Sequence, residues 1–136
     1  VSNWREALAR ALDGRPLTVV YDPVGGDFSE PALRSLAPDG RFLVVGFASG
    51  GISEMPLNLV LLKRCSIVGV NWGGYIAENP GESRVMLNAI IELVSNAKLA
   101  PQAGQQFALK DAGTAMMKML NRESIGKVVI SMDRSK

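Results

Sequence analysis

The segment Arg41-Phe42-Leu43-Val44-Val45-Gly46-Phe47 decides the fold, because it is the strongest strand signal in the chain. Its apolar residues follow one another without alternating with polar ones. This is typical of a strand in a parallel sheet that is buried on both faces. A glycine-rich stretch, Ala48-Ser49-Gly50-Gly51, comes directly after it. We therefore expect a strand whose carboxyl end opens into a glycine-rich turn.

Two similar strands are expected on either side of this one. Residues 17–21 form a short β-branched run that breaks at Asp22-Pro23-Val24-Gly25-Gly26, and residues 66–71 form an apolar run that breaks at Trp72-Gly73-Gly74. Helical patterns begin at Ser2 or Asn3 and end near residue 12, and recur at residues 29–36 and 57–63. This alternation predicts the second half of a doubly wound α/β fold, a parallel sheet covered by helices on both faces.

The pattern changes character near residue 100. A helical stretch over residues 81–97 ends before Pro101, and a brief strand at 107–109, a methionine-rich helix at 111–120 and a last strand at 126–132 follow. We expect Met116, Met117 and Met119 to fill a core beneath a partner rather than to form a recognition face. The predicted division is a partial nucleotide-binding domain over residues 1–100 and a separate C-terminal segment over residues 101–136.

Composition and charge exclude several classes of protein. The 136 residues are 47% apolar and 21% charged, which is ordinary for a globular domain and unlike a disordered chain. A net charge of +2 is too small to indicate binding to nucleic acid or to an anionic membrane. No stretch approaches the roughly 20 apolar residues that span a bilayer. We expect neither a nucleic acid nor a membrane partner.

The chain has one cysteine and no histidine. Cys65 lies among apolar residues, so we expect a buried thiol rather than a nucleophile, and a reducing, cytoplasmic location. The absence of histidine removes the commonest general base and the commonest metal ligand, so we expect no zinc site within the chain. Asp22 is the one acidic residue in the predicted groove, and we expect it to stabilise a turn rather than to catalyse a reaction.

All three predicted strands are followed by glycine-rich breaks. Because ligands bind at the carboxyl ends of strands in such sheets, three of these loops at one edge favour a groove for a flat, extended ligand. For any single loop, a tight turn remains the simpler interpretation. The GxGxxG pattern that cradles a pyrophosphate is absent, so a phosphate site would lie ahead of Val1.

Several runs together resemble one known family. Val19-Val20-Tyr21-Asp22-Pro23-Val24-Gly25-Gly26 and the stretch 33–50 resemble the second half of the cofactor domain in the medium-chain dehydrogenase/reductase superfamily, in its NADPH:quinone oxidoreductase (zeta-crystallin-like) branch. Pro56-Leu57-Asn58-Leu59, the stretch 68–73 and the ending Gly126-Lys127-Val128-Val129-Ile130 continue the likeness. The resemblance covers essentially the whole chain in order. It implies a C-terminal fragment with a Rossmann-like sheet, in which residues 101–136 return to the catalytic domain.

The resemblance also implies cofactor-binding roles for individual residues, and no catalytic residue or metal ligand among them. It places the first group along the cofactor ribose, namely Pro23, Val24 and Gly25. It places the second beside the nicotinamide, namely Gly46, Phe47, Ala48 and Ser49. It places the third beside the carboxamide and the substrate pocket, namely Val70, Asn71 and Trp72. Lys127 would approach the cofactor phosphates, with a solvated lysine at the end of a strand as its alternative. Trp72 has the alternative of filling a core.

The implied reaction is hydride transfer from NADPH to a quinone or an activated alkene, with NADH not excluded. One alternative is a catalytically incomplete chain that dimerises or binds a partner, because the strand at 17–21 would have an unpaired edge. Another is a zinc alcohol dehydrogenase or enoyl-thioester reductase of the same superfamily. The resemblance further implies a homodimer formed through the strand at 66–71.

Overall fold

The computed structural model describes residues 3–132, so the predicted capping role of Ser2 lies outside the described residues. The chain forms two compact units, which divide between Asn79 and Pro80. Each unit is described by itself. The predicted boundary near residue 100 concerns the two domains of a parent enzyme, and it stays a prediction.

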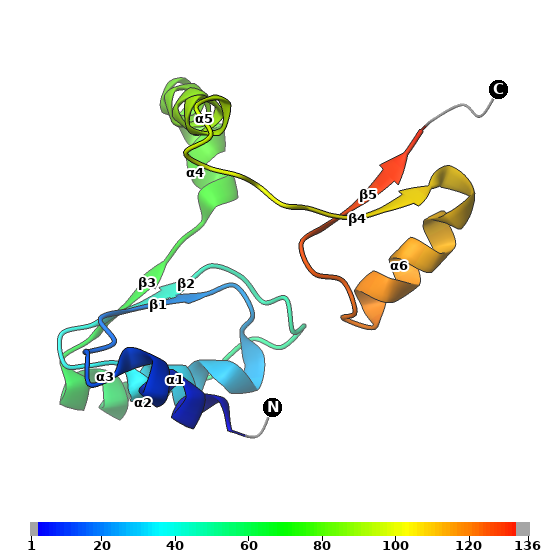
Figure 1. Ribbon diagram of the computed structural model, residues 1–136. Coiled ribbons are helices and arrows are strands. Elements are labelled where there is room, and N and C mark those ends of the chain that lie inside the picture. The colour runs from blue at the N-terminus through cyan, green and yellow to red at the C-terminus, as the bar shows by residue number, and fades with distance from the viewer. Residues whose placement is uncertain (1–2, 133–136) are drawn as a thin grey trace. The chain divides into compact units, whose positions relative to one another are not determined.

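The first unit is built on a parallel sheet of three strands, β1 (Val19–Asp22), β2 (Arg41–Val44) and β3 (Ser66–Gly69), in the order β1-β2-β3. Val20, Phe42 and Ile67 are aligned across the strands. All three strands run in the same direction, which confirms the expected parallel α/β arrangement (Figure 1). β3 ends at Gly69, two residues before the predicted end.

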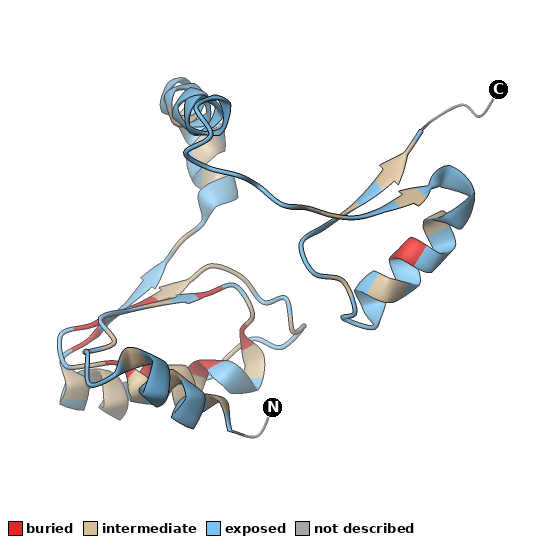
Figure 2. Ribbon diagram, in the orientation of Figure 1, coloured by how far each residue is buried: buried red, intermediate tan, exposed pale blue. Residues whose placement is uncertain are grey.

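Helices α1 (Trp4–Leu12), α2 (Ser29–Ser35) and α3 (Leu57–Lys63) lie on one face of this sheet (Figure 1). A 3-10 turn, η1 (Gly26–Phe28), leads into α2. The core lies between these helices and the sheet, where Figure 2 shows the buried residues gathered. Its buried members are Leu33, Leu36, Phe42 and Cys65. The buried thiol of Cys65 agrees with the sequence analysis.

Within the first unit the opposite face of the sheet is exposed, so the expectation of helices on both faces stays a prediction. Tyr21 is 65% exposed and Val68 is 39% exposed. Both are aligned with Leu43, one residue along from the Val20–Phe42–Ile67 row, so their side chains point to the other face of the sheet. A continuous apolar run shows that both faces of a strand are apolar. It does not show that helices of the same unit cover each of these faces.

Helix α4 (Trp72–Glu78) closes the first unit, and the sequence analysis missed it. The pair Gly73-Gly74 was interpreted as a break because glycine is unfavourable inside a helix. Here both glycines lie in the first turn, where Asn71 caps the helix. The cap supplies the partner that the first backbone amides of a helix lack.

The second unit contains α5 (Pro80–Ser95), β4 (Ala103–Ala108), η2 (Leu109–Asp111), α6 (Ala112–Leu120) and β5 (Lys127–Ser131). β4 and β5 pair in parallel, and α6 crosses between them. β4 begins four residues before the predicted strand. Met116 is 65% exposed, and Met117 and Met119 are also exposed, so the partner that we expect to cover them stays a prediction. Among residues 3–132, no helix is long and apolar enough to cross a membrane.

Candidate functional site

Three loops leave the sheet at the same edge, because parallel strands have their carboxyl ends together. We call them the first loop (residues 22–26, beginning at the last residue of β1), the second loop (residues 46–51, after β2) and the third loop (residues 70–74, after β3 and including the first turn of α4). The first and second loops are joined by backbone hydrogen bonds. The amide of Ala48 donates to the carbonyl of Pro23 at 3.1 Å, and the amide of Ser49 donates to the carbonyl of Val24 at 2.9 Å. These two loops therefore form one continuous surface.

Glycines in the first loop allow this close packing. Gly25 has a φ of +70°, and a Cβ there would lie 2.7 Å from Cδ1 of Phe47. Gly26 has a φ of +63°, and a Cβ there would lie 2.7 Å from Oγ of Ser49. Glycine is needed at both positions for its left-handed backbone and for its lack of a side chain. In the first loop, packing against the second loop accounts for both glycines.

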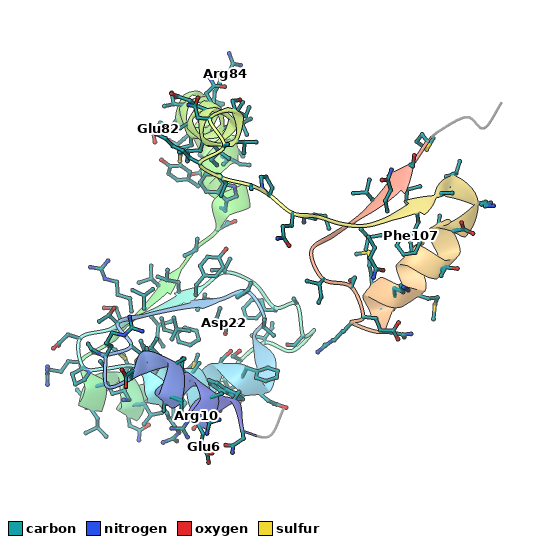
Figure 3. The ribbon with its side chains drawn as sticks, in the orientation of Figure 1. Glu6, Arg10, Asp22, Glu82, Arg84 and Phe107 are labelled. Carbon is teal, nitrogen blue, oxygen red and sulfur yellow. The ribbon has the colours of Figure 1, made fainter. Side chains whose placement is uncertain are left out.

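Asp22 holds the first loop in shape. Its Oδ1 accepts hydrogen bonds from the amides of Val24 and Gly25, both at 2.9 Å, and its Oδ2 accepts one from the hydroxyl of Ser29 at 2.6 Å. The side chain lies at the end of β1 (Figure 3). Burial raises the pKa of Asp22, but the hydrogen bonds from Ser29, Gly25 and Val24 outweigh it, so the net pKa is lowered. The carboxylate therefore caps a turn, as the sequence analysis expected.

The second and third loops border an open cleft of about 520 Å³. It brings together five of the predicted site residues, namely Gly46, Phe47, Val70, Asn71 and Trp72. Phe47 is 43% exposed and Trp72 is 50% exposed, so both rings are accessible. A Cβ at Gly69, which also lines the cleft, would meet no atom within 4 Å. The cleft is thus wide, with two aromatic rings at its border.

The remaining predicted residues lie elsewhere. Pro23 and Val24 line a second hollow of about 400 Å³, which is mostly apolar and includes Trp4 and Phe28. Ala48 and Ser49 belong to the second loop, and Gly25 is buried beneath it. Lys127 is exposed at the start of β5 in the second unit, so its approach to cofactor phosphates stays a prediction.

The third loop is organised by Asn71. Its Oδ1 accepts a hydrogen bond from the amide of Gly74 at 3.0 Å, which caps α4. The ring of Trp72 stacks on that of Tyr75, with centroids 5.9 Å apart and planes 18° from parallel. Asn71 therefore uses one side-chain oxygen to hold the helix that carries Trp72. The preference for asparagine at the start of helices was the sequence signal for this cap.

Comparison with known proteins identifies the family. Residues 2–130 match the family described as zinc-binding dehydrogenase. The chain belongs to this family. The match places it in the medium-chain dehydrogenase/reductase superfamily, as the resemblance implied.

Relatives of the dehydrogenase chain include quinone oxidoreductases. It is 40% identical over 129 residues to quinone oxidoreductase-like protein 2 of Bos taurus, covering 94% of this chain and 37% of the relative. It is 30% identical over 128 residues to the quinone oxidoreductase of Pseudomonas aeruginosa, covering 94% of this chain and 39% of the relative. The chain thus spans less than two fifths of the length of either protein.

A solved structure of the same superfamily has the same fold. The Escherichia coli quinone oxidoreductase, solved in complex with NADPH, is 25% identical with a TM-score of 0.78, over 94% of this chain and 40% of the other. The quinone oxidoreductase of Pseudomonas syringae is 29% identical with a TM-score of 0.75, over 93% and 39% of the two chains. These similarities confirm the Rossmann-like fold class.

Zinc ligands in proteins are histidine, cysteine and acidic side chains. Within the part of the dehydrogenase chain that the structure describes, no three His, Cys, Asp or Glu side chains come together as a possible metal site. The sequence contains no histidine, and the thiol of Cys65 is buried in the core. The described residues therefore do not fit a zinc ion, and no role for zinc is assigned to them.

Proposed function

We propose that this chain forms the nicotinamide-facing part of an NADPH-dependent oxidoreductase that transfers hydride to a quinone or an activated alkene. One observation carries the proposal: the second and third loops, at the carboxyl edge of a parallel sheet, border a cleft with two accessible aromatic rings. The solved Escherichia coli quinone oxidoreductase of the same fold contains NADPH. When bound, NADPH would supply the hydride.

The backbone chemistry of the second loop is compatible with a carboxamide. The amides of Gly46 and Ala48 already donate hydrogen bonds to the carbonyls of Asp22 and Pro23, and the amide of Ser49 donates to that of Val24. The second loop can therefore offer carbonyl oxygens, which accept hydrogen bonds from an amide NH₂ group. The rings of Phe47 and Trp72 offer flat apolar surface to the nicotinamide and to an aromatic substrate.

The first loop contributes in a different way. Pro23 is exposed and Val24 is half-buried, so these two residues can lie along a ribose. Gly25 is buried and donates its amide to Asp22, so we assign it to the shape of the loop. Lys127 remains our candidate for the cofactor phosphates. We propose a cytoplasmic location for this enzyme.

A segment exchange tests the proposal. This chain would replace the matching segment of the Escherichia coli quinone oxidoreductase, and the hybrid would be assayed for NADPH oxidation with a benzoquinone acceptor. We expect saturable oxidation of NADPH. A hybrid that folds, as judged by circular dichroism, but does not bind NADPH would contradict the proposal. Preference for NADH, or dependence on added zinc, would favour the other members of the superfamily named above.

Cofactor binding by the isolated chain is a separate question from activity of the hybrid, because three strands would provide only one half of a dinucleotide site. Titration of the 136-residue chain with NADPH, followed by nicotinamide fluorescence, should show no saturable binding at micromolar concentrations. Saturable micromolar binding would show that these loops suffice to hold the cofactor.

A further inference from the structure

Two serine hydroxyls extend the hydrogen bonding of Asp22 away from the first loop. Ser29, the first residue of α2, is 1% exposed. Its Oγ lies 2.6 Å from Oδ2 of Asp22 and 2.6 Å from Oγ of Ser53. Ser53 is 24 residues further along the chain, just after the second loop. The three side chains therefore form a continuous chain of hydrogen bonds.

Proton counting sets the direction of this chain of hydrogen bonds. A serine hydroxyl carries one proton, and Ser29 donates its proton to the carboxylate of Asp22. Ser53 must then be the donor to Ser29. Its alternative acceptor, the carbonyl of Gly26, lies at 3.4 Å and is the weaker partner. The ionised Asp22 thus directs the Ser53 hydroxyl toward Ser29.

This arrangement attaches the segment 49–53 to its surroundings at both ends. At one end the amide of Ser49 donates to the carbonyl of Val24. At the other end the hydroxyl of Ser53 bonds Ser29. Gly50 and Gly51 lie between, and Gly50 has a φ of +88° with open space around it. Without the Ser53 hydroxyl, the segment would lose the side-chain hydrogen bond that joins its far end to α2.

We propose that Ser29 and Ser53 are positioning residues, which act through Asp22 to hold the second loop in a fixed shape against the first. The proposal rests on the proposed function, because a cofactor lying on these loops would need them fixed. A buried hydroxyl that donates to a carboxylate forms a charge-assisted hydrogen bond, which is stronger than an ordinary one. Pre-organised loops bind a ligand without first being ordered.

Amide hydrogen exchange of the full 136-residue chain, measured by NMR, tests the positioning role. In Ser53→Ala, exchange of the amides of Ala48 and Ser49, which donate to carbonyls of the first loop, should become roughly tenfold faster. Exchange within β1 and β2 should stay unchanged. Ser53→Thr keeps the hydroxyl and should restore slow exchange. The matched control is Ser35→Ala, on the same helix as Ser29, because Ser35 Oγ donates to the carbonyl of Pro31 and accepts a long hydrogen bond from Arg5, both outside the two loops. It should leave the loop unchanged.

The carboxyl group of Asp22 provides a second measurement. Ser29→Ala removes a hydrogen bond to the carboxylate, so the pKa of Asp22 measured by ¹³C NMR should rise, whereas Ser35→Ala should not change it. Unaltered exchange of the Ala48 and Ser49 amides in Ser53→Ala would overturn the proposal. So would failure of Ser53→Thr to restore it.

The hybrid enzyme separates this proposal from the proposed function. If the hybrid is active, Ser53→Ala should raise the KM for NADPH roughly three- to tenfold with little change in kcat. An equal loss in the Ser35→Ala hybrid would contradict positioning. Faster loop exchange in Ser53→Ala together with an inactive hybrid would reject the proposed function and still support the role of Ser53 in shaping the loops.

Discussion

At the scale of single residues, the carboxyl edge of the sheet depends on a few small side chains. Asp22 accepts three hydrogen bonds, two from amides of the first loop and one from the first residue of α2. Gly25 and Gly26 let the second loop pack directly on the first. None of these residues needs to touch a ligand to matter for binding, since they determine where Phe47 and the backbone carbonyls of the second loop lie.

Replacement of Gly25 should be costly for two reasons. Gly25→Ala places a side chain at a φ of +70° and 2.7 Å from Cδ1 of Phe47. We expect the free energy of unfolding, measured with urea, to fall by roughly 2–4 kcal/mol. The control is Gly14→Ala, where φ is +75° but no atom lies within 4 Å of the new Cβ. It carries the backbone strain alone, about 1 kcal/mol. Equal losses in the two variants would show that Phe47 moves aside freely.

The lowered pKa of Asp22 links stability to pH. A carboxyl group whose pKa is lower in the folded state stabilises the fold at neutral pH, and this contribution disappears as the pH falls through the lowered value. Asp22→Asn cannot titrate. Its amide nitrogen can still donate to Ser29, which reverses the chain of hydrogen bonds toward the carbonyl of Gly26.

Urea unfolding between about pH 7 and about pH 2 measures this contribution. The native chain should lose stability on acidification more steeply than Asp22→Asn, so that the difference between the two proteins shrinks at low pH. Parallel curves would show that the pKa of Asp22 is the same in the folded and unfolded states.

At the scale of elements, the third loop is held by contacts between residues that are close together in the sequence. α4 has seven residues, and helices this short depend on capping and packing for their stability. Asn71 supplies the cap, and Gly74 accommodates it, because a Cβ on Gly74 would lie 2.6 Å from Nδ2 of Asn71. Trp72 and Tyr75 stack on the outside of the helix. The position of the Trp72 ring at the cleft thus depends on the Asn71 cap.

Removal of this cap should be visible in the aromatic signal. Asn71→Ala should weaken α4 by about 1 kcal/mol and reduce the near-ultraviolet circular dichroism of the Trp72–Tyr75 pair. Asn71→Asp keeps an oxygen that can accept from Gly74, so it should retain most of the signal. If Asn71→Ala has a native spectrum, the cap does not hold the rings in place.

At the scale of the whole molecule, the first unit presents sheet surface that nothing in its described residues covers. One face of the sheet is exposed, and β1 and β3 are its two edge strands. All four residues of β3 are exposed. An unpaired strand edge is a template for pairing with another chain. We therefore propose a homodimer through residues 66–71.

Sedimentation tests this dimer. The native chain should dimerise at high protein concentration, and Val68→Lys should shift it to monomer, because charged side chains oppose pairing of edge strands. Val19→Lys, on β1 at the other edge and also exposed, is the control and should leave the dimer intact. A native chain that stays monomeric, or an equal effect of both lysines, would contradict pairing through β3.

Much of the fold could be predicted because the decisive signals are local. Runs such as Phe42–Val45 report strands, and prolines and glycines report where elements end. The resemblance of these runs to one superfamily is confirmed by the family match over residues 2–130. α4 was missed because Gly73-Gly74 looks like a break until its cap is seen. The Ser29–Ser53 pair could not be found from sequence, because 24 residues separate two ordinary serines.

The amino-acid sequence alone determined three strands, the glycine-rich turns after the first two, a buried cysteine and the superfamily. Only the tertiary structure decided that helices cover one face of the described sheet, that Gly25 and Gly26 serve loop packing, and that Phe47 and Trp72 border one cleft. The physical reason is the distance along the chain over which each kind of interaction acts. Periodicity and turn preferences act between near neighbours in the chain, whereas these contacts depend on which strands pair and in what register.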